Sequence, residues 1–136
     1  MAMYVQDELE RYGQSVPDQF GGLYMDESTF VALFTTDLDR HRAALRDRLS
    51  GQRGWRVQRG DRTWQEVERA NAAVQHILWD TRQHPDVHTI GIGMRVGQFV
   101  ISVGIDPYTS DRADELTRIT RPHPVIIEHQ GPLVLL

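Results

Sequence analysis

The chain has 136 residues and a formal net charge of −4, with 40% hydrophobic and 25% charged residues, a composition typical of a soluble globular protein. It has no cysteine, which excludes disulfides, thiolate metal ligands and cysteine nucleophiles. All 15 basic residues are arginine, a bias typical of high-GC coding sequences, so no lysine is available for a Schiff base or a P-loop.

Charge and hydropathy patterns exclude two classes of partner. Acidic residues interrupt the basic ones, even in the densest basic segment, Arg53–Arg62, so we expect no nucleic-acid partner. No apolar run approaches the roughly 20 residues that cross a bilayer, so we expect no membrane partner. The first residues lack the basic segment and apolar core of a signal peptide, which leaves a cytoplasmic protein or a mature secreted fragment.

The first half of the chain predicts a helix, two strands, a helix and a strand. These elements are a helix over 3–13, strands at Phe20–Met25 and Thr29–Thr35, a helix over 36–49 and a strand at Trp55–Arg59. The strand at Thr29–Thr35 is apolar on both faces, which favours a central or covered position in its sheet. Thr36 is expected to cap the second helix, with Asp39 as the acidic member of a capping box.

The second half predicts the same order of elements. They are a helix over 63–84, strands at Thr89–Met94 and Gln98–Ile105, a helix over 110–120 and a strand at Val125–Glu128. Thr63 and Glu66 form a capping box, and Pro85 disfavours a helical residue before it, so this helix is expected to end near residue 84. Thr109 or Ser110 is expected to cap the last helix.

The order αββαβ therefore occurs twice, at an offset of roughly 70 residues. We predict an α+β fold built from this duplicated unit, with small mixed or antiparallel sheets packed against helices. The first repeat is expected over 1–61 and the second over 62–136, together forming one compact globular unit. The alternative is that two unrelated segments look alike because apolar alternation is common.

Residues with metal-binding or acid–base chemistry form no known motif. His84 and His88 are four apart, but a proline separates them and no glutamate completes a zincin helix, so we predict no metal site and no cofactor. Asp37, Asp39 and His41 gather at the start of a helix, where they could act as an acid–base group. The acids also complement the helix dipole, which suffices as a structural explanation.

Small residues predict a protein-binding surface in the second half of the chain. Gly91, Gly93, Ser102 and Gly104 alternate with the apolar positions of their two strands, so one face of the sheet is left nearly free of side chains. Such a face permits the close approach of another backbone. Because these glycines lie in a hairpin and do not open a helix, they do not form a dinucleotide-binding loop.

The C-terminal tail is the other candidate protein-binding segment. Its apolar residues are Leu133, Val134, Leu135 and Leu136. The tail can add a strand to its own sheet, or it can insert into a groove or sheet edge of another protein, and the sequence leaves both options open.

The segment Gly21–Glu27, followed by the apolar run Phe30–Phe34, resembles the prosegments of streptogrisin and α-lytic-type serine proteases, in which a glycine–apolar–aspartate strand, a return strand and a helix recur. In organisation the resemblance extends from about Gln19 to Glu128. It implies a non-enzymatic foldase or inhibitor that packs a sheet and its C-terminal tail against a protease.

We therefore expect a non-catalytic protein-binding module, such as a prosegment-like inhibitor or folding chaperone, whose partner is a protein such as a protease. Two alternatives stay open. One is a small metal-dependent or acid/base-dependent hydrolase that uses Asp37, Asp39 and His41. The other is a structural subunit of a homo-oligomer, because the oligomeric state does not follow from the sequence.

Overall fold

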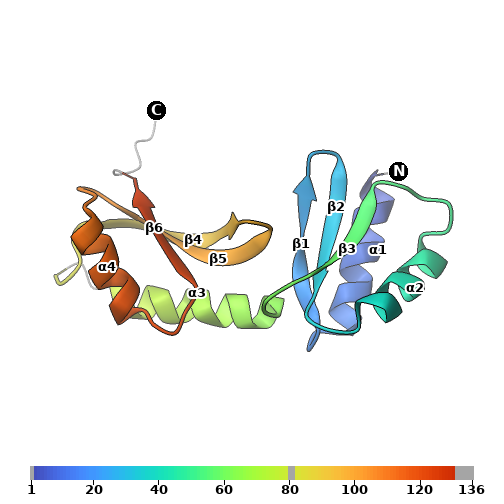
Figure 1. Ribbon diagram of the computed structural model, residues 1–136, viewed down its shortest axis with the longest axis horizontal. Coiled ribbons are helices and arrows are strands. Elements are labelled where there is room, and N and C mark those ends of the chain that lie inside the picture. The colour runs from blue at the N-terminus through green and yellow to red at the C-terminus, as the bar shows by residue number, and fades with distance from the viewer. Residues whose placement is uncertain (1, 80–81, 131–136) are drawn as a thin grey trace. The chain divides into compact units, whose positions relative to one another are not determined.

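A computed structural model describes residues 2–79 and 82–130 of the chain (Figure 1). Contacts between residues divide the chain into two compact units, Met1–Glu66 (unit 1) and Val67–Leu136 (unit 2). Unit 1 contains α1 (Ala2–Ser15), β1 (Phe20–Asp26), β2 (Thr29–Phe34), α2 (Leu38–Arg48) and β3 (Trp55–Arg59). Helix α3 (Trp64–Leu78) leads into unit 2, which continues with β4 (Val87–Arg95), β5 (Gln98–Ile105), α4 (Ser110–Ile119) and β6 (Val125–His129). The predicted α+β class with two αββαβ units is confirmed.

Each unit builds a three-stranded mixed sheet. In unit 1 the order is β1-β2-β3, with β1 and β2 antiparallel and β2 and β3 parallel. Helices α1 and α2 lie on one side of this sheet (Figure 1). The core between them consists of Val5, Leu9, Tyr12, Phe20, Ala32, Phe34, Leu45, Leu49 and Val57. As predicted, β2 is the central strand, and its last four residues are buried.

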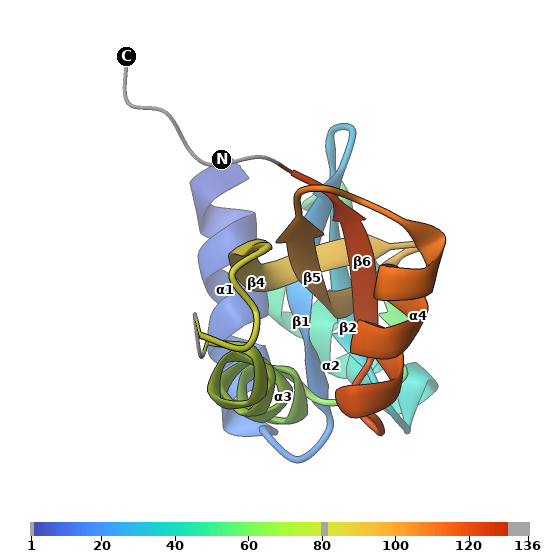
Figure 2. The same cartoon turned by 90° about the vertical axis from the view of Figure 1, so that its left-hand side faces the viewer.

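Unit 2 repeats this arrangement with the order β4-β5-β6, again antiparallel and then parallel. Helices α3 and α4 lie on one side of the sheet (Figures 1 and 2). The buried apolar residues of these elements are Val67, Ala70, Val74 and Leu78 in α3, Ala113 and Leu116 in α4, Val87 in β4, and Val100, Ile101, Val103 and Ile105 in β5. The apolar alternation of β5 therefore places Ile101, Val103 and Ile105 on one face.

The two units agree in the detail of their hydrogen bonds. Both first strands skip one residue near their start, between Phe20 and Gly22 and between Val87 and Thr89. Two hydrogen bonds in the loops of unit 1 also have equivalents in unit 2, all at 2.9 or 3.0 Å. The Thr35 N–H donates to the Gln19 carbonyl as the Asp106 N–H does to the Asp86 carbonyl. The Gly60 N–H donates to the Phe34 carbonyl as the Gln130 N–H does to the Ile105 carbonyl. Apolar alternation alone would not reproduce a bulge and its flanking hydrogen bonds, so the similarity extends to backbone geometry.

The helix caps follow the sequence at two of three sites. Thr63 and Glu66 form the predicted capping box, with distances of 2.9 and 3.1 Å, and the Thr109 hydroxyl accepts from the Arg112 N–H at 3.1 Å. The prediction for α2 was wrong, because its N-cap is Asp37 and not Thr36. Asp37 has a left-handed backbone (φ 54°) and makes no side-chain cap bond, whereas a capping side chain requires an extended backbone.

Helix α3 ends earlier than expected, at Leu78 and not near residue 84. Leu78 is the last buried residue of its apolar stripe, while Trp79 is exposed, and the sequence that follows is polar. Helices depend on tertiary packing of an apolar face, so the loss of that face ends α3 before Pro85 is reached. No helix in the described ranges is both long and apolar enough to cross a membrane.

Candidate functional site

The predicted small-residue surface lies on β4 and β5 of unit 2. Gly91 pairs directly with Ser102, and Gly93 pairs with Val100. Residues paired across two strands share a face, so Gly91, Gly93 and Ser102 lie on the face opposite Ile101 and Val103. Gly104, opposite Thr89, lies on this face as well, so the structure brings all four predicted small residues to one face.

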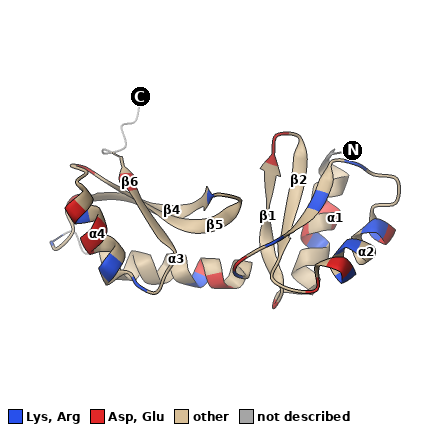
Figure 3. Cartoon of the chain, viewed as in Figure 1, with Lys and Arg blue, Asp and Glu red and all other residues tan. Residues whose placement is uncertain are grey.

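This face is open at its centre. A Cβ added at Gly91 would meet nothing within 4 Å, and one added at Gly93 would come 3.2 Å from the Ser102 Cβ. Apart from His88 and Arg95 near the two ends of β4, neither strand carries an acidic or basic residue, and Figure 3 shows both strands free of acidic residues. The space above Gly91 is therefore open, so another backbone can approach it closely.

Gly104 has a different role from the other three residues. It is buried, and a Cβ there would collide with the Thr89 hydroxyl and would lie 2.7 Å from the Gln130 Cβ. The Thr89 hydroxyl donates to the Gln130 amide oxygen at 3.3 Å and so helps to hold that side chain over the glycine. Gly104 is thus explained by packing within its own unit, and it is not part of the bare surface that we expected.

Ser102 is held by a polar contact on the same face. Its hydroxyl donates to the carboxylate of Glu128, which is exposed on β6. The arrangement presents a carboxylate and a hydroxyl at the surface, without a histidine to activate the serine. It can therefore hydrogen-bond to a partner, and it lacks the layout of a nucleophile.

An exposed apolar tip, which the sequence did not predict, adjoins this surface. Val96 is 93% exposed and has φ 51°, next to Gly97 with φ 72°, in the two-residue turn between Arg95 and Gln98. Such turns favour Asn-Gly or Asp-Gly, and a β-branched residue with positive φ is strained by about 1–3 kcal/mol. Met94, before the turn, is 38% exposed but pairs with Phe99 and so lies on the opposite face, with Ile101. The sequence signal for this exposed tip is the valine at the first turn position, where asparagine or aspartate is preferred.

We call Gly91, Gly93, Val96 and Ser102 the hairpin surface. All four lie on β4, on β5 or in the turn that joins them. The other predicted binding residues, Leu133–Leu136, fall outside the described residues.

The acid–base group Asp37, Asp39 and His41 is not assembled as a site. His41 is 1% exposed and stacks on the Phe34 ring, with 4.2 Å between centroids. Its Nδ1 accepts from the Tyr12 hydroxyl at 2.6 Å, and its Nε2–H donates to the Gln19 amide oxygen at 2.6 Å.

This arrangement fits a neutral imidazole. Burial lowers the pKa of His41, the charge of Arg40 lowers it further, and Asp37 and Asp18 oppose both effects. Asp39 is engaged elsewhere, with an oxygen 2.8 Å from Arg42 Nη1. Because both ring nitrogens are bonded inside unit 1, His41 has none left for a substrate.

Unit 2 holds an ion pair where unit 1 holds this histidine. Gln19 and Asp86 occupy equivalent positions, because their backbone carbonyls accept the matching loop hydrogen bonds of the two units. The Gln19 side chain accepts from His41 in α2, and the Asp86 side chain accepts from Arg112 in α4. Arg112 Nε and Nη2 donate to the two Asp86 oxygens at 2.7 and 2.9 Å. Arg112 lowers the pKa of the Asp86 carboxyl, against the effect of burial.

Arg112 Nη2 also lies 3.0 Å from His84 Nδ1, so this histidine is tied to the same cluster. Within residues 2–79 and 82–130, no group of three or more histidine and acidic side chains is arranged to hold a metal ion.

No protein-family model matches the chain, and no match was found among curated proteins.

Proposed function

We propose that the chain is a non-catalytic protein-binding module that packs the hairpin surface against a serine protease of the streptogrisin or α-lytic type, as an inhibitor or a folding chaperone. The observation that carries this proposal is Val96, an apolar β-branched side chain held in a strained backbone and almost fully exposed. A strained, exposed residue persists where something other than folding favours it, and binding is such a cause.

The chemistry of the neighbouring residues supports a protein as the occupant. Gly91 and Gly93 let a backbone come close, while Val96 offers apolar contact at the end of the hairpin. The nearly uncharged strands avoid the desolvation cost that buried charges would add to an interface. The choice of a protease as the partner rests on the resemblance of Gly21–Glu27 and the segment after it to protease prosegments.

The hydrolase alternative has less support, because its histidine is a core residue. The homo-oligomer alternative competes for the same surface, since a second copy could cover Val96. Measurement of the mass in solution separates the two binding modes, because a monomer leaves the hairpin surface free for another protein.

The test is inhibition of a streptogrisin-type protease acting on a chromogenic peptide, together with its refolding yield in the presence of the chain. We expect inhibition or improved refolding, and we expect Val96→Asn to weaken the effect at least tenfold, about 1.4 kcal/mol. Asparagine tolerates positive φ, so this variant should be at least as stable as the parent.

A second variant, Gly91→Ile, adds bulk where nothing lies within 4 Å, and it should also weaken binding without unfolding the protein. Ala72→Ile, at an exposed position of α3, is the matched control. Absence of both inhibition and refolding assistance would contradict the proposal, as would equal effects of the Gly91 and Ala72 variants.

A further inference from the structure

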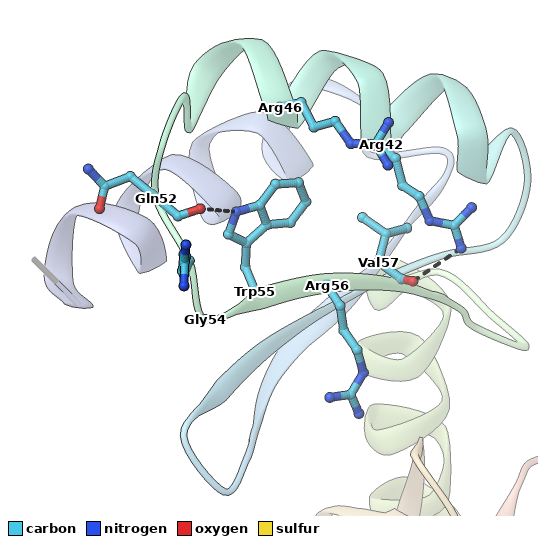
Figure 4. A pocket seen from close by; sticks show the side chains of 8 residues that line it. Arg42, Arg46, Gln52, Gly54, Trp55, Arg56 and Val57 are labelled. Atoms are coloured by element: carbon cyan, nitrogen blue, oxygen red, sulfur yellow. Dashed lines mark hydrogen bonds between the residues drawn. The ribbon is translucent and has the colours of Figure 1, made fainter.

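Unit 1 contains a pocket of about 460 Å³ between α2, the loop that follows it and β3 (Figure 4). Arg42 and Arg46 reach it from α2, Arg53 comes from the loop, and Trp55 and Val57 come from β3. The volume lies in the range of small-ligand sites, roughly 300–1,000 Å³. None of the residues that line this pocket is acidic.

Two of the pocket's arginines make no ion pair or hydrogen bond with the described residues. Arg42 pairs with Asp39 at 2.8 Å, and Arg56 points away from the other side chains (Figure 4) and pairs with Asp26 at 2.7 Å. Arg46 and Arg53 are exposed, and neither has a hydrogen bond or ion pair within the described part of the chain. Two positive charges therefore face the pocket without an internal counter-ion, which favours an anionic occupant.

The indole of Trp55 gives the pocket an apolar wall. Its Nε1–H donates to the Gln52 carbonyl at 3.2 Å, so the ring offers its face and not its donor to a ligand. Figure 4 shows the ring between α2 and β3, on the side of the strand from which Arg46 approaches. A ligand that carries both an anionic group and an apolar stem would use both features.

The edge of β3 restricts how a peptide can enter. Among the described strands, β3 pairs with β2 alone, so no described strand lies along its other edge. Arg42 Nη2 covers this edge at the Val57 carbonyl, 3.4 Å away, and would compete with a strand added there. The geometry therefore favours recognition through side chains that enter the pocket.

We propose that this pocket is a second binding site that takes a short acidic segment of a protein partner, with carboxylates on Arg46 and Arg53 and an apolar stem on Trp55. This proposal rests on the proposed function, because it takes the pocket's occupant to be part of a protein partner. A long polyanion such as nucleic acid needs a continuous basic face. The whole chain has a net charge of −4, and Asp39 and Asp47 lie among the arginines of α2.

The test is fluorescence anisotropy of a labelled glutamate hexapeptide titrated with the full chain at low ionic strength, with a glutamine hexapeptide in parallel. We expect binding of the glutamate peptide alone, and weakening by about tenfold in the double variant Arg46→Gln, Arg53→Gln. The matched control is Arg69→Gln, Arg118→Gln, which changes the same charge at two exposed helical positions and should bind as the parent does.

Three results would overturn the assignment. They are no binding of the glutamate peptide, equal weakening by the two double variants, and tighter pocket-dependent binding of inorganic phosphate than of the peptide. The peptide assay needs no protease, so its failure leaves the hairpin proposal standing, while loss of protease inhibition with intact peptide binding would count against the hairpin alone.

Discussion

Removal of one hydroxyl group tests the core of unit 1. Tyr12→Phe keeps the aromatic ring, which lies edge-on to Phe34 with 5.9 Å between centroids, and deletes the donor that is 2.6 Å from His41 Nδ1. Because His41 is 1% exposed, water cannot readily replace that donor.

The magnitude follows from what remains after the change. The buried apolar area is almost unchanged, so the hydrophobic contribution cancels, while a buried acceptor without a partner costs about 1–3 kcal/mol. We expect the free energy of unfolding of unit 1 to fall by that amount. Tyr4→Phe is the control, because its hydroxyl bonds to the Arg48 carbonyl at an exposed site and should change stability by less than about 0.5 kcal/mol.

Urea unfolding gives the change, and hydrogen exchange assigns it to unit 1. A double-mutant cycle with His41→Leu separates the loss of the hydrogen bond from other destabilising effects of the substitutions. In the His41→Leu background the acceptor is already absent, so Tyr12→Phe should lower the free energy of unfolding very little further. The reasoning is refuted if Tyr12→Phe behaves as Tyr4→Phe does, or if the two core substitutions are simply additive.

Three other predictions concern the described contacts. Because burial lowers the pKa of His41 from 6.5, its contribution to stability is full above about pH 6.5 and is lost as the pH falls toward the folded-state pKa; a urea midpoint that does not change below pH 6.5 would contradict this. Asp86→Asn weakens the two hydrogen bonds from Arg112 and should lower the free energy of unfolding by about 1.5–3 kcal/mol at neutral pH; an unchanged urea midpoint would count against the ion pair. In the parent, the pKa of Asp86 is lowered from 3.8, so the contribution of this ion pair to stability is lost as the pH falls below 3.8 through the folded-state pKa. Gly104→Ala should destabilise unit 2 by about 1–3 kcal/mol because of the collision with Thr89, whereas Gly91→Ala should change stability by less than about 0.5 kcal/mol; equal thermal midpoints would refute the packing described at Gly104.

Local signals in the sequence predicted most of the elements. The capping box at Thr63 and Glu66 and the alternation of β5 depend on neighbours within a few residues, so they could be read without the fold. The failures at Thr36 and at the end of α3 have the opposite cause. Backbone conformation at Asp37 and the extent of the apolar contact at Leu78 are set by the rest of unit 1 and unit 2.

The candidate sites depend still more on distant residues. Gly91 and Gly104 look alike in the sequence, and they differ because the chain returns at Gln130 to cover Gly104. The acid–base interpretation of His41 failed because Tyr12 and Gln19, far away in the sequence, take both of its nitrogens. The arginine pocket was not predicted either, since its residues come from a helix, a loop and a strand.

The most direct measurement of the central claim is hydrogen exchange of the chain with and without a catalytically inactivated streptogrisin-type protease. Contact through the hairpin surface predicts slower exchange across the β4–β5 hairpin, Val87–Ile105, in the complex. Unchanged exchange in this hairpin, in a sample where the two proteins are bound, would contradict the claim that it is the interface.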